Sequence, residues 1–307
     1  MLTVFLAAAR CASFLQGGAT LQFSMIPMLL LHGSGKTAEY LRTGYWSGKA
    51  IPEARLEGDV RVVWDGQAHG FRRLPNISEL SLSDNAAYLH YASNETVEGL
   101  QFHDIPGIEG VPRVCDMSSD FLSRSFDPER YDLIYAHAQK NLGPAGVTVV
   151  IVRRELLARV PDGLPPMLDY RTHVNAGSIY NTPPVFAIYV VLLVTRWLLN
   201  DIGGLEQMDS INRDKAESLY GVIDNSGGFY EGWADSANRS LMNVAFRLPS
   251  AECEAAFLQQ SAGEGFSGLA GHRSLGGIRA SIYNAMTPQA VDFLCQFMKD
   301  FARSHMA

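Results

Sequence analysis

The sequence is poor in the features that mark disulfide-rich, nucleic-acid-binding and membrane proteins. It has four cysteines, which are far apart: Cys11, Cys115, Cys253 and Cys295. They form no CxxC pair, so neither a zinc site nor a disulfide framework is indicated, and a reducing compartment such as the cytoplasm fits best. The formal net charge is −7 and no basic stripe is present, which argues against a nucleic-acid partner.

Long apolar runs are also missing. Residues 185–199 are apolar, but they include Arg196 and are too short to span a membrane, so we expect a buried helix there and no membrane partner. Residues 1–12 are apolar as well. They lack a basic start and are interrupted by Arg10, which is not typical of a signal peptide.

Some catalytic motifs do not occur, among them HExxH and GxSxG. Residues 33–37, GSGKT, end like a phosphate-binding P-loop. Leu30 stands where the first glycine of that motif should be, so we interpret the segment as a polar loop.

What the sequence does have is the composition of a globular α/β protein. The 307 residues are 47% hydrophobic, enough for one large domain and a smaller one. A strand-like start at Phe14 leads through Gly17-Gly18 into a helical run broken at Pro27, and a helix is expected around Trp46 within residues 36–55. Short strands are expected at residues 61–64, 86–92, 113–117, 132–136 and 147–152. Strands separated by helix-length segments predict a mostly parallel sheet with covering helices.

The pattern changes at Gly203-Gly204. Beyond it, helices and strands alternate in an α+β manner, with helices at residues 206–220, 251–260 and 287–303 and strands at residues 243–248 and 278–283. We therefore expect a large cofactor-binding domain at residues 1–203 and a small C-terminal α+β domain at residues 204–307.

The stretch from Tyr131 to Val152 carries the first candidate for chemistry. It contains two apolar strands joined by a turn rich in glycine and proline, and Lys140 lies beside that turn. A lysine held between buried strands has a lowered pKa, because desolvation disfavours the ammonium, and its free amine is then a nucleophile. The alternative is a solvated lysine at a strand end, which is the usual situation.

Asp116 is the second candidate. It ends an apolar strand 24 residues before Lys140, and a carboxylate there is costly to bury without a partner. A protonated pyridine nitrogen is one partner that would justify it, as in pyridoxal phosphate chemistry. A helix cap or a loop aspartate is the alternative.

Two further positions could contact a cofactor. Gly17-Gly18-Ala19-Thr20 precedes a helix, where backbone N–H groups can bind phosphate, although Gly-Gly is often only a turn. The flat ring of Trp46 could stack on a cofactor or belong to the core.

Three other groups of polar residues remain open between binding and structural roles. Thr96 could meet a ligand or cap a turn. Asn181-Thr182 could reach a phosphate or cap the helix that follows. His272, Arg273 and Arg279 could bind a carboxylate or phosphate, or they could form a solvated basic loop.

The sequence around these residues resembles that of one family. Eight segments carry the resemblance: GGATLQF, GYWS, LSDNAAYLHYASNETVEG, DMSSDFLSR, AQKNLGPAGVTVVIVR, NTPPVFA, LYGVIDNS and GHRSLGGIRASIYNAM. From about Phe14 to the C-terminus they resemble the phosphoserine aminotransferases, which are class-V, fold-type I pyridoxal phosphate enzymes. The resemblance implies that fold, pyridoxal 5′-phosphate as the cofactor, and amino transfer from glutamate to 3-phosphooxypyruvate in serine biosynthesis.

The resemblance also implies a role for each cofactor-binding residue. Lys140 attaches the cofactor and then moves a proton between the substrate Cα and C4′ of the cofactor. Asp116 pairs with the pyridine nitrogen, Trp46 stacks on the ring, and Thr96 bonds to its hydroxyl side. The phosphate is held by a further set: Ala19, Thr20 and Gln139.

By the same resemblance the protein is a homodimer with active sites at the interface. Asn181 and Thr182 reach the phosphate of the neighbouring subunit's cofactor. Arg279 takes the substrate α-carboxylate, while His272 and Arg273 take the phosphate of phosphoserine or the distal carboxylate of glutamate, which leaves as 2-oxoglutarate. An anionic side chain must be met by fixed cations, so His272-Arg273 argues against a class-V relative with another amino donor.

The sequence also departs from the family pattern. Family members begin with a segment carrying Gly-Pro and Ser-His-Arg motifs, whereas this sequence starts just before the Gly-Gly stretch. Residues 1–13 do not match, the link at residues 31–35 is irregular, and His137 stands where the family usually has glycine. We therefore expect an aminotransferase with impaired turnover. The alternative is a non-catalytic remnant that binds the cofactor or dimerises with an intact paralogue.

Overall fold

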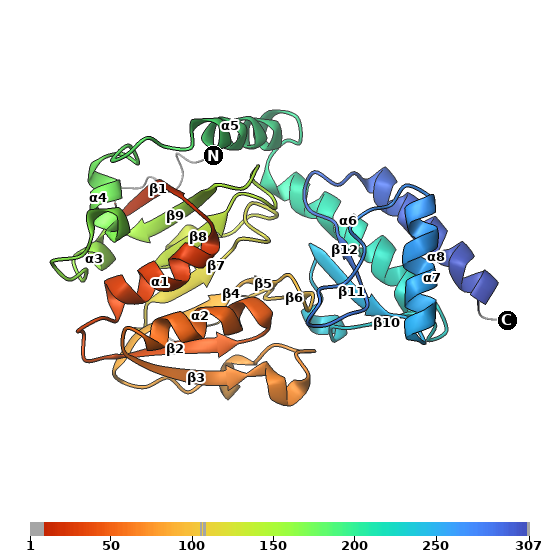
Figure 1. Cartoon of the computed structure of the whole chain (residues 1–307), viewed down its shortest axis with the longest axis horizontal. Helices are drawn as coiled ribbons and strands as arrows, with labels where there is room; N and C mark the ends of the chain where they lie inside the picture. Colours follow the sequence, from red (N-terminus) through yellow and green to blue (C-terminus); the bar gives the residue numbers. More distant parts are fainter. Residues whose placement is uncertain (1–8, 105, 107–108, 306–307) are drawn as a thin grey trace.

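The computed structural model describes residues 9–104, 106 and 109–305. Figure 1 shows a large sheet with its helices at the left and a smaller sheet with its helices at the right, joined through α6. Of the apolar segment at residues 1–12, residues 1–8 lie outside the described residues.

Among the described residues, seven strands form the large sheet in the order β1-β9-β8-β7-β4-β2-β3. Their bounds are β1 Arg10–Gln16, β2 Thr37–Arg42, β3 Asp59–Asp65, β4 Ala86–Ala92, β7 Arg113–Asp116, β8 Leu133–His137 and β9 Val147–Arg153. The pairs β2·β3, β2·β4, β4·β7 and β7·β8 are parallel, whereas β9 is antiparallel to both β8 and β1. The predicted mostly parallel sheet is therefore confirmed. A small hairpin, β5 Asn94–Glu95 and β6 Leu100–Gln101, follows β4.

Helices cover both faces of this sheet. Their bounds are α1 Ala19–Leu30, α2 Tyr45–Arg55, α3 Arg154–Leu157, α4 Tyr170–Asn175 and α5 Val185–Asn200. On one face, apolar residues of α1 and α2 pack on the sheet, including Phe23 and Ile26 against Tyr88 and Tyr135. On the other face, α5 packs into a second cluster through Val191 and Leu198. Burial on both faces explains why every residue of β4 and β8 is buried.

The second unit has its own antiparallel sheet, β10-β11-β12. Its elements are α6 Leu205–Asp224, β10 Glu231–Gly232, β11 Asn243–Arg247, α7 Ala251–Gly263, β12 Ile278–Ser281 and α8 Pro288–His305. Its buried core is drawn from residues 216–302, with Phe246, Phe257 and Phe301 in edge-on contact. We propose Gly203-Gly204, where both glycines have positive φ, as the boundary between the large and small domains.

Two sequence predictions about local structure are wrong. The helix after Gly18 does not break at Pro27 but continues to Leu30, and the Pro27 carbonyl accepts the N–H groups of Leu31 and His32, which follow the helix. Residues 37–42 form strand β2, which was not expected. The apolar pattern of this strand is interrupted by Glu39, a buried carboxylate. It forms an ion pair with Arg61 of β3, with Arg61 Nε 2.9 Å from Glu39 Oε2.

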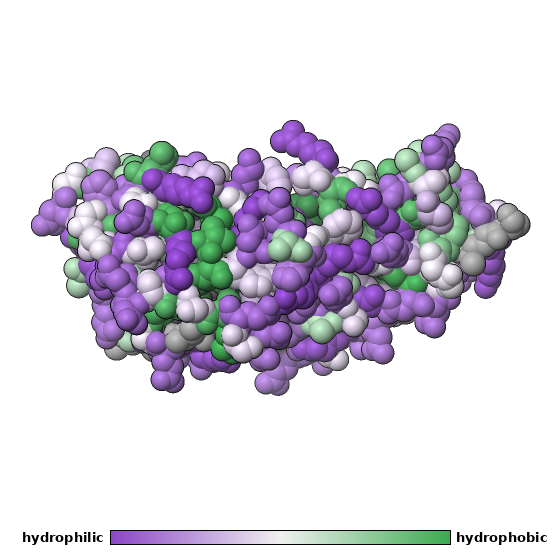
Figure 2. All heavy atoms as spheres, turned by 90° about the horizontal axis from the view of Figure 1, so that it is seen from below, coloured by the Kyte–Doolittle hydropathy of each residue, from purple (hydrophilic) through white to green (hydrophobic). Residues whose placement is uncertain are grey.

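The prediction of a buried helix at residues 185–199 is also wrong in part. The helix is present as α5, but much of its apolar surface is exposed, with Val185 at 65% and Phe186 at 75% exposure. α5 lies at the top of Figure 1, away from the largely hydrophilic face in Figure 2. No single helix in the described residues is long and apolar enough to cross a membrane. In the same residues, α5 and α6 taken together have the length and composition of a membrane span, but they are bent by 88° at the break between them.

Candidate active site

One pocket gathers most of the predicted cofactor residues. It has a volume of about 150 Å³ and lies where β4, β7 and β8 end and where α1 and α2 begin. Seven of the predicted residues line it: Ala19, Thr20, Trp46, Thr96, Asp116, Gln139 and Lys140. The carboxyl ends of parallel strands are the usual ligand position in open α/β sheets, so the topology explains the convergence.

Lys140 lines this pocket from the turn after β8. Its Nζ donates a hydrogen bond to Thr96 Oγ1 at 2.5 Å and lies 5.9 Å from the centre of the Trp46 ring. Burial lowers the pKa of Lys140 to about 8, against an opposing effect of Asp116, and the positive charge of Arg279 lowers this pKa further. Roughly a tenth of its amine is therefore uncharged at pH 7, far more than for an ordinary lysine.

Asp116 faces the same pocket from the end of β7. Its Oδ1 accepts the Ser118 backbone N–H at 2.8 Å. Burial raises the pKa of Asp116, while hydrogen bonds from Ser118, the charge of Lys140 and a hydrogen bond from Tyr135 oppose the rise. The Tyr135 hydroxyl in turn lies 2.8 Å from His90 Nε2. A cation placed against Asp116 would relieve the cost of burying its charge.

The start of α1 also lines the pocket, through Gly18, Ala19 and Thr20. Gly18 is its N-cap residue and supplies no capping side chain, and its first turn contains no acidic residue. The N–H groups at this end can therefore bind an anion. Gln139 and His137 line the pocket beside them.

Two buried glutamates that sequence reasoning missed hold the start of α2. Glu95 accepts the Trp46 and Ser47 N–H groups, each at 3.1 Å, and Glu98 accepts the Tyr45 N–H at 2.9 Å. Burial raises the pKa of both, and together with the neighbouring Glu95 it brings the pKa of Glu98 to about 8. Their signal was two carboxylates three residues apart directly after a buried strand.

The predicted substrate cations do not all converge. Arg279 of β12 reaches the pocket rim, with Nη1 3.5 Å from the Thr96 carbonyl oxygen. Its Nε is buried without a hydrogen-bond partner among the described residues. The His272 ring lies against Tyr45, the residue before Trp46, with the ring centres 4.7 Å apart and the planes tilted by 55°. Arg273 is exposed.

Asn181 and Thr182 lie outside the pocket of their own chain. They precede α5, and Gln16 Nε2 donates to the Thr182 carbonyl at 2.5 Å. The side chain of Thr182 is exposed.

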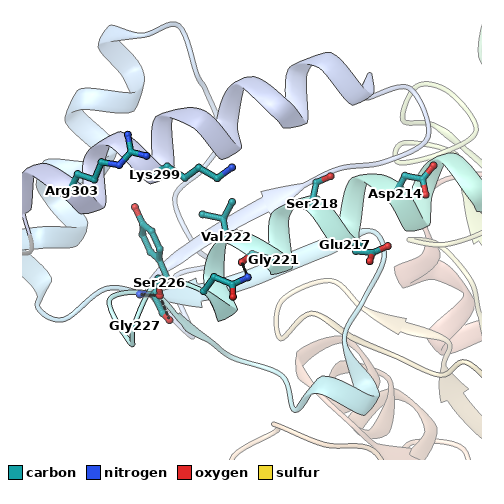
Figure 3. Close-up of a pocket in the computed structure, with 11 residues that line it drawn as sticks. Asp214, Glu217, Ser218, Gly221, Val222, Ser226, Gly227, Lys299 and Arg303 are labelled. Carbon is teal, nitrogen blue, oxygen red and sulfur yellow. Dashed lines mark hydrogen bonds between the residues drawn. The ribbon is translucent and has the colours of Figure 1, made fainter.

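A wider groove elsewhere gathers none of the predicted residues. It has a volume of about 880 Å³ and lies between α6 and α8, with Asp214 and Glu217 on one side and Lys299 and Arg303 on the other (Figure 3). Within the described ranges, no cluster of three or more His, Cys, Asp or Glu residues could hold a metal ion.

The residues of the smaller pocket fit pyridoxal phosphate. An uncapped helix start with an amide beside it suits a phosphate, a buried carboxylate suits a protonated ring nitrogen, and an indole suits a ring face. A lysine with a lowered pKa suits an aldehyde.

Comparisons with known proteins agree with this arrangement. The family model Aminotransferase class-V matches residues 5–294. The phosphoserine aminotransferase of Rhodopirellula baltica is 53% identical over 290 residues, which cover 94% of this chain and 77% of that protein. That of Niallia circulans is 53% identical over 291 residues, which cover 95% and 80%.

Solved structures show the same similarity. The phosphoserine aminotransferase from Bacillus circulans subsp. alkalophilus superposes with a TM-score of 0.96 at 51% identity, over 99% of this chain and 84% of that one. A pyridoxal phosphate-bound phosphoserine aminotransferase from Trichomonas vaginalis gives a TM-score of 0.87 at 36% identity, over 97% and 84%.

Proposed function

The chain belongs to the phosphoserine aminotransferases, within the class-V aminotransferases, and from this premise we propose which of its residues carry out the reaction. It has the fold-type I architecture, uses pyridoxal 5′-phosphate, and transfers an amino group between phosphoserine and 2-oxoglutarate in serine biosynthesis. When bound, the cofactor supplies an aldehyde that takes up the amino group and a ring that accepts electrons from the substrate Cα.

Lys140 is the proposed attachment and proton-transfer residue. The observation that carries this assignment is that Lys140 lines the pocket with its Nζ bonded to Thr96 Oγ1 and its pKa lowered to about 8. An amine that is readily uncharged can attack an aldehyde and later accept the Cα proton. The hydrogen bond to Thr96 Oγ1 fixes Nζ between Trp46 and the end of β7.

The rest of the pocket orients the cofactor. Asp116 pairs with the ring nitrogen and keeps it protonated, while Trp46 covers one face of the ring and excludes water. The N–H groups of Ala19 and Thr20, with the Gln139 amide, bind the phosphate dianion. A buried acceptor and an uncapped helix start in the same pocket support these roles.

The substrate's negative charges meet cations of the small domain. Arg279 binds the α-carboxylate, because it reaches Thr96 and keeps a buried, unpartnered Nε in the described structure. His272, packed on Tyr45, and the exposed Arg273 bind the phosphate of phosphoserine or the distal carboxylate of glutamate. One anion site of this kind explains why both amino acids are substrates.

The protein acts as a homodimer in this proposal. The exposed apolar side chains of α5 include Val185, Phe186 and Tyr189, a surface of the kind that symmetric interfaces bury. Asn181 and Thr182 lie directly before it, so a partner docked there receives them beside its own phosphate site. Four free cysteines support a cytoplasmic location.

Reduction with borohydride tests the assignment of Lys140. We expect reduction of the cofactor-loaded protein to fix the cofactor on the peptide that contains Lys140. Lys215 is the matched control, because burial also lowers its pKa to about 8 while its Nζ is held by three carbonyl oxygens. Modification of Lys215 but not Lys140 contradicts the site assignment. A cofactor spectrum that ignores both phosphoserine and glutamate favours a non-catalytic remnant.

A further inference from the structure

His137 is a pocket residue that the reaction described above leaves without a role. It ends β8, three residues before Lys140, and its side chain is buried, with 8% exposed. It lines the pocket together with Gly18, Ala19 and Gln139. Its surroundings determine which of its ring nitrogens is free to bind a ligand.

One edge of the ring is fixed by the turn before β9. The Gly146 N–H donates to His137 Nε2 at 3.1 Å, and the Gly146 carbonyl accepts the Gly17 N–H at 3.2 Å. Gly146 has a φ of +111°, which favours glycine. The turn thus connects the ring of His137 to the chain just before α1.

The hydrogen bond from Gly146 also determines the tautomer. Because a backbone N–H can only donate, Nε2 must be the accepting nitrogen, and the proton of the neutral ring is on Nδ1. Burial and the charge of Lys140 lower the pKa of His137, against a smaller effect of a hydrogen bond to Gln139, which agrees with a neutral ring. His137 therefore has an N–H donor at Nδ1.

That donor faces the start of α1. The Nδ1 and Cε1 atoms lie 3.9 and 3.8 Å from the position that a Cβ on Gly18 would take. Gly18 is the uncapped N-cap of the twelve-residue helix α1. The Nδ1–H group, the helix N–H groups and the Gln139 side chain thus line the same pocket. The hydrogen bond between His137 and Gln139 raises the pKa of the ring, so the Gln139 amide oxygen accepts from it, and an anion bound here would share the Nδ1–H group with this oxygen.

We propose that His137 binds the cofactor phosphate, donating Nδ1–H to a phosphate oxygen beside the N–H groups of Ala19 and Thr20. This inference rests on the proposed function, since it uses the same pocket. A purely structural role, in which His137 only anchors Gly146, is the competing explanation.

Two amide substitutions separate the explanations. In H137N the side-chain amide takes the place of Nδ1, which keeps a donor toward the pocket and loses the contact with Gly146. In H137Q the amide takes the place of Nε2, which keeps an acceptor for Gly146 and loses the donor toward the pocket. Each variant removes one of the two contacts of the ring.

The measurement is the dissociation constant of full-length, cofactor-stripped protein for pyridoxal phosphate and for pyridoxal, which lacks the phosphate. We expect H137Q to bind pyridoxal phosphate about ten- to hundredfold more weakly, with pyridoxal binding changed less than about twofold. We expect H137N to bind both compounds within about threefold of the wild type. The phosphorus NMR shift of the bound phosphate should move in H137Q more than in H137N.

Several results overturn the proposal: the reverse order of the variants, equal weakening of both compounds, or no change in either. If H137Q does not fold, H137L takes its place, because it also lacks the donor at Nδ1. Weaker pyridoxal phosphate binding in H137L with retained binding in H137N supports the phosphate contact, and equal binding by the two variants contradicts it. H173N is the control, because His173 is equally buried but binds the Met167 carbonyl away from the pocket. If the wild type forms no adduct at Lys140, the proposed function fails instead.

Discussion

At the scale of the residue, the proposed cofactor contact of Asp116 carries a cost in stability. Burial raises its pKa, so the folded protein binds more protons than the unfolded chain once the pH exceeds the ordinary value of 3.8. Stability is therefore lost as the pH rises from that value through the folded-state pKa. The negative charge of Asp116, which would pair with the cofactor ring, is disfavoured by burial in the cofactor-free protein.

D116N should accordingly stabilise the cofactor-free protein and impair the enzyme. We expect the thermal midpoint of the stripped protein to rise by a few degrees at pH 8, and the gain to shrink toward pH 5, because Asn cannot ionise. Turnover should fall on the order of 100-fold or more. Thermal scans at several pH values and a coupled assay give the two readouts. A variant that is less stable at pH 8 and fully active contradicts the role.

Arg279 should act on Lys140 as well as on substrate. Its positive charge lowers the Lys140 pKa, so R279M should move the midpoint for cofactor attachment, followed as rate against pH, to higher pH. The same variant should raise KM for glutamate about tenfold or more through the lost carboxylate contact.

R279K separates these two effects. The variant keeps a positive charge, so the pH midpoint for cofactor attachment should stay where it is in the wild type. Its single ammonium cannot reproduce the two-point contact of a guanidinium with a carboxylate, so KM for glutamate should still rise. An unchanged midpoint in R279M means that the Arg279 side chain does not act on Lys140.

The site residues that could be predicted from the sequence were charged residues next to apolar strands and glycines directly before a helix. Lys140 and Asp116 stand at the ends of apolar strands, and the Gly-Gly before α1 precedes a helix without a cap. Glu95 and Tyr135 were missed for opposite reasons. A glutamate in a polar turn is usually solvated, and a tyrosine in a buried strand is usually core, so only their contacts distinguish them.

At the scale of the element, the start of α2 is held by a carboxylate that titrates within an accessible pH range. Glu98, with a pKa of about 8, caps Tyr45, and its Oε2 has no hydrogen-bond partner in the described structure. Between its ordinary value of 4.5 and about 8 the folded state holds the extra proton. The free energy of unfolding therefore falls as the pH rises through that window.

E98Q should remove this loss. We expect it to match the wild type near pH 5 and to exceed it by about 1 to 4 kcal/mol at pH 9, measured by denaturant unfolding. E79Q is a control of opposite sign, because Arg73 lowers the pKa of the exposed Glu79 to about 2 and that stabilisation is present at neutral pH. A constant difference between E98Q and wild type across this range excludes titration of Glu98.

Helices and strands were predictable where a continuous apolar pattern marked them, and were missed or misjudged where burial depended on a distant partner. The strands β4, β8 and β9 are continuous apolar runs and were expected within a residue or two. β2 was missed because its buried Glu39 depends on Arg61, twenty-two positions away. α5 was expected to be buried because it is apolar all round, but the residues that cover such a face need not belong to the same chain.

At the scale of the whole molecule, the site combines both parts of the chain. Lys140, Asp116 and Trp46 come from the large sheet and its helix, whereas Arg279 comes from β12 and touches the Thr96 carbonyl. The sequence indicated this through the order of its motifs, but no pattern in one chain could place Asn181 and Thr182. They lie outside their own pocket and beside the exposed face of α5.

The dimer proposal predicts that substitutions on this face separate the protomers. F186E and V185E place charge on the most exposed apolar residues of α5 and should give monomers by sedimentation, with weaker cofactor binding. F293E, on an exposed residue of α8 in the small domain, is the control and should leave the assembly unchanged.

Mixing two damaged chains then tests whether the site is shared. K140A loses the lysine, and N181A/T182A loses the residues offered to the partner. In a mixed dimer, the N181A/T182A chain keeps its own Lys140 and receives Asn181 and Thr182 from K140A, so one of its two sites is intact. Refolding the two variants together at equal concentration should restore roughly one quarter of wild-type activity, because half of the dimers are mixed and half of their sites are complete. If Asn181 and Thr182 instead served their own chain, no site in the mixture would be complete and activity would stay at the level of the separate variants.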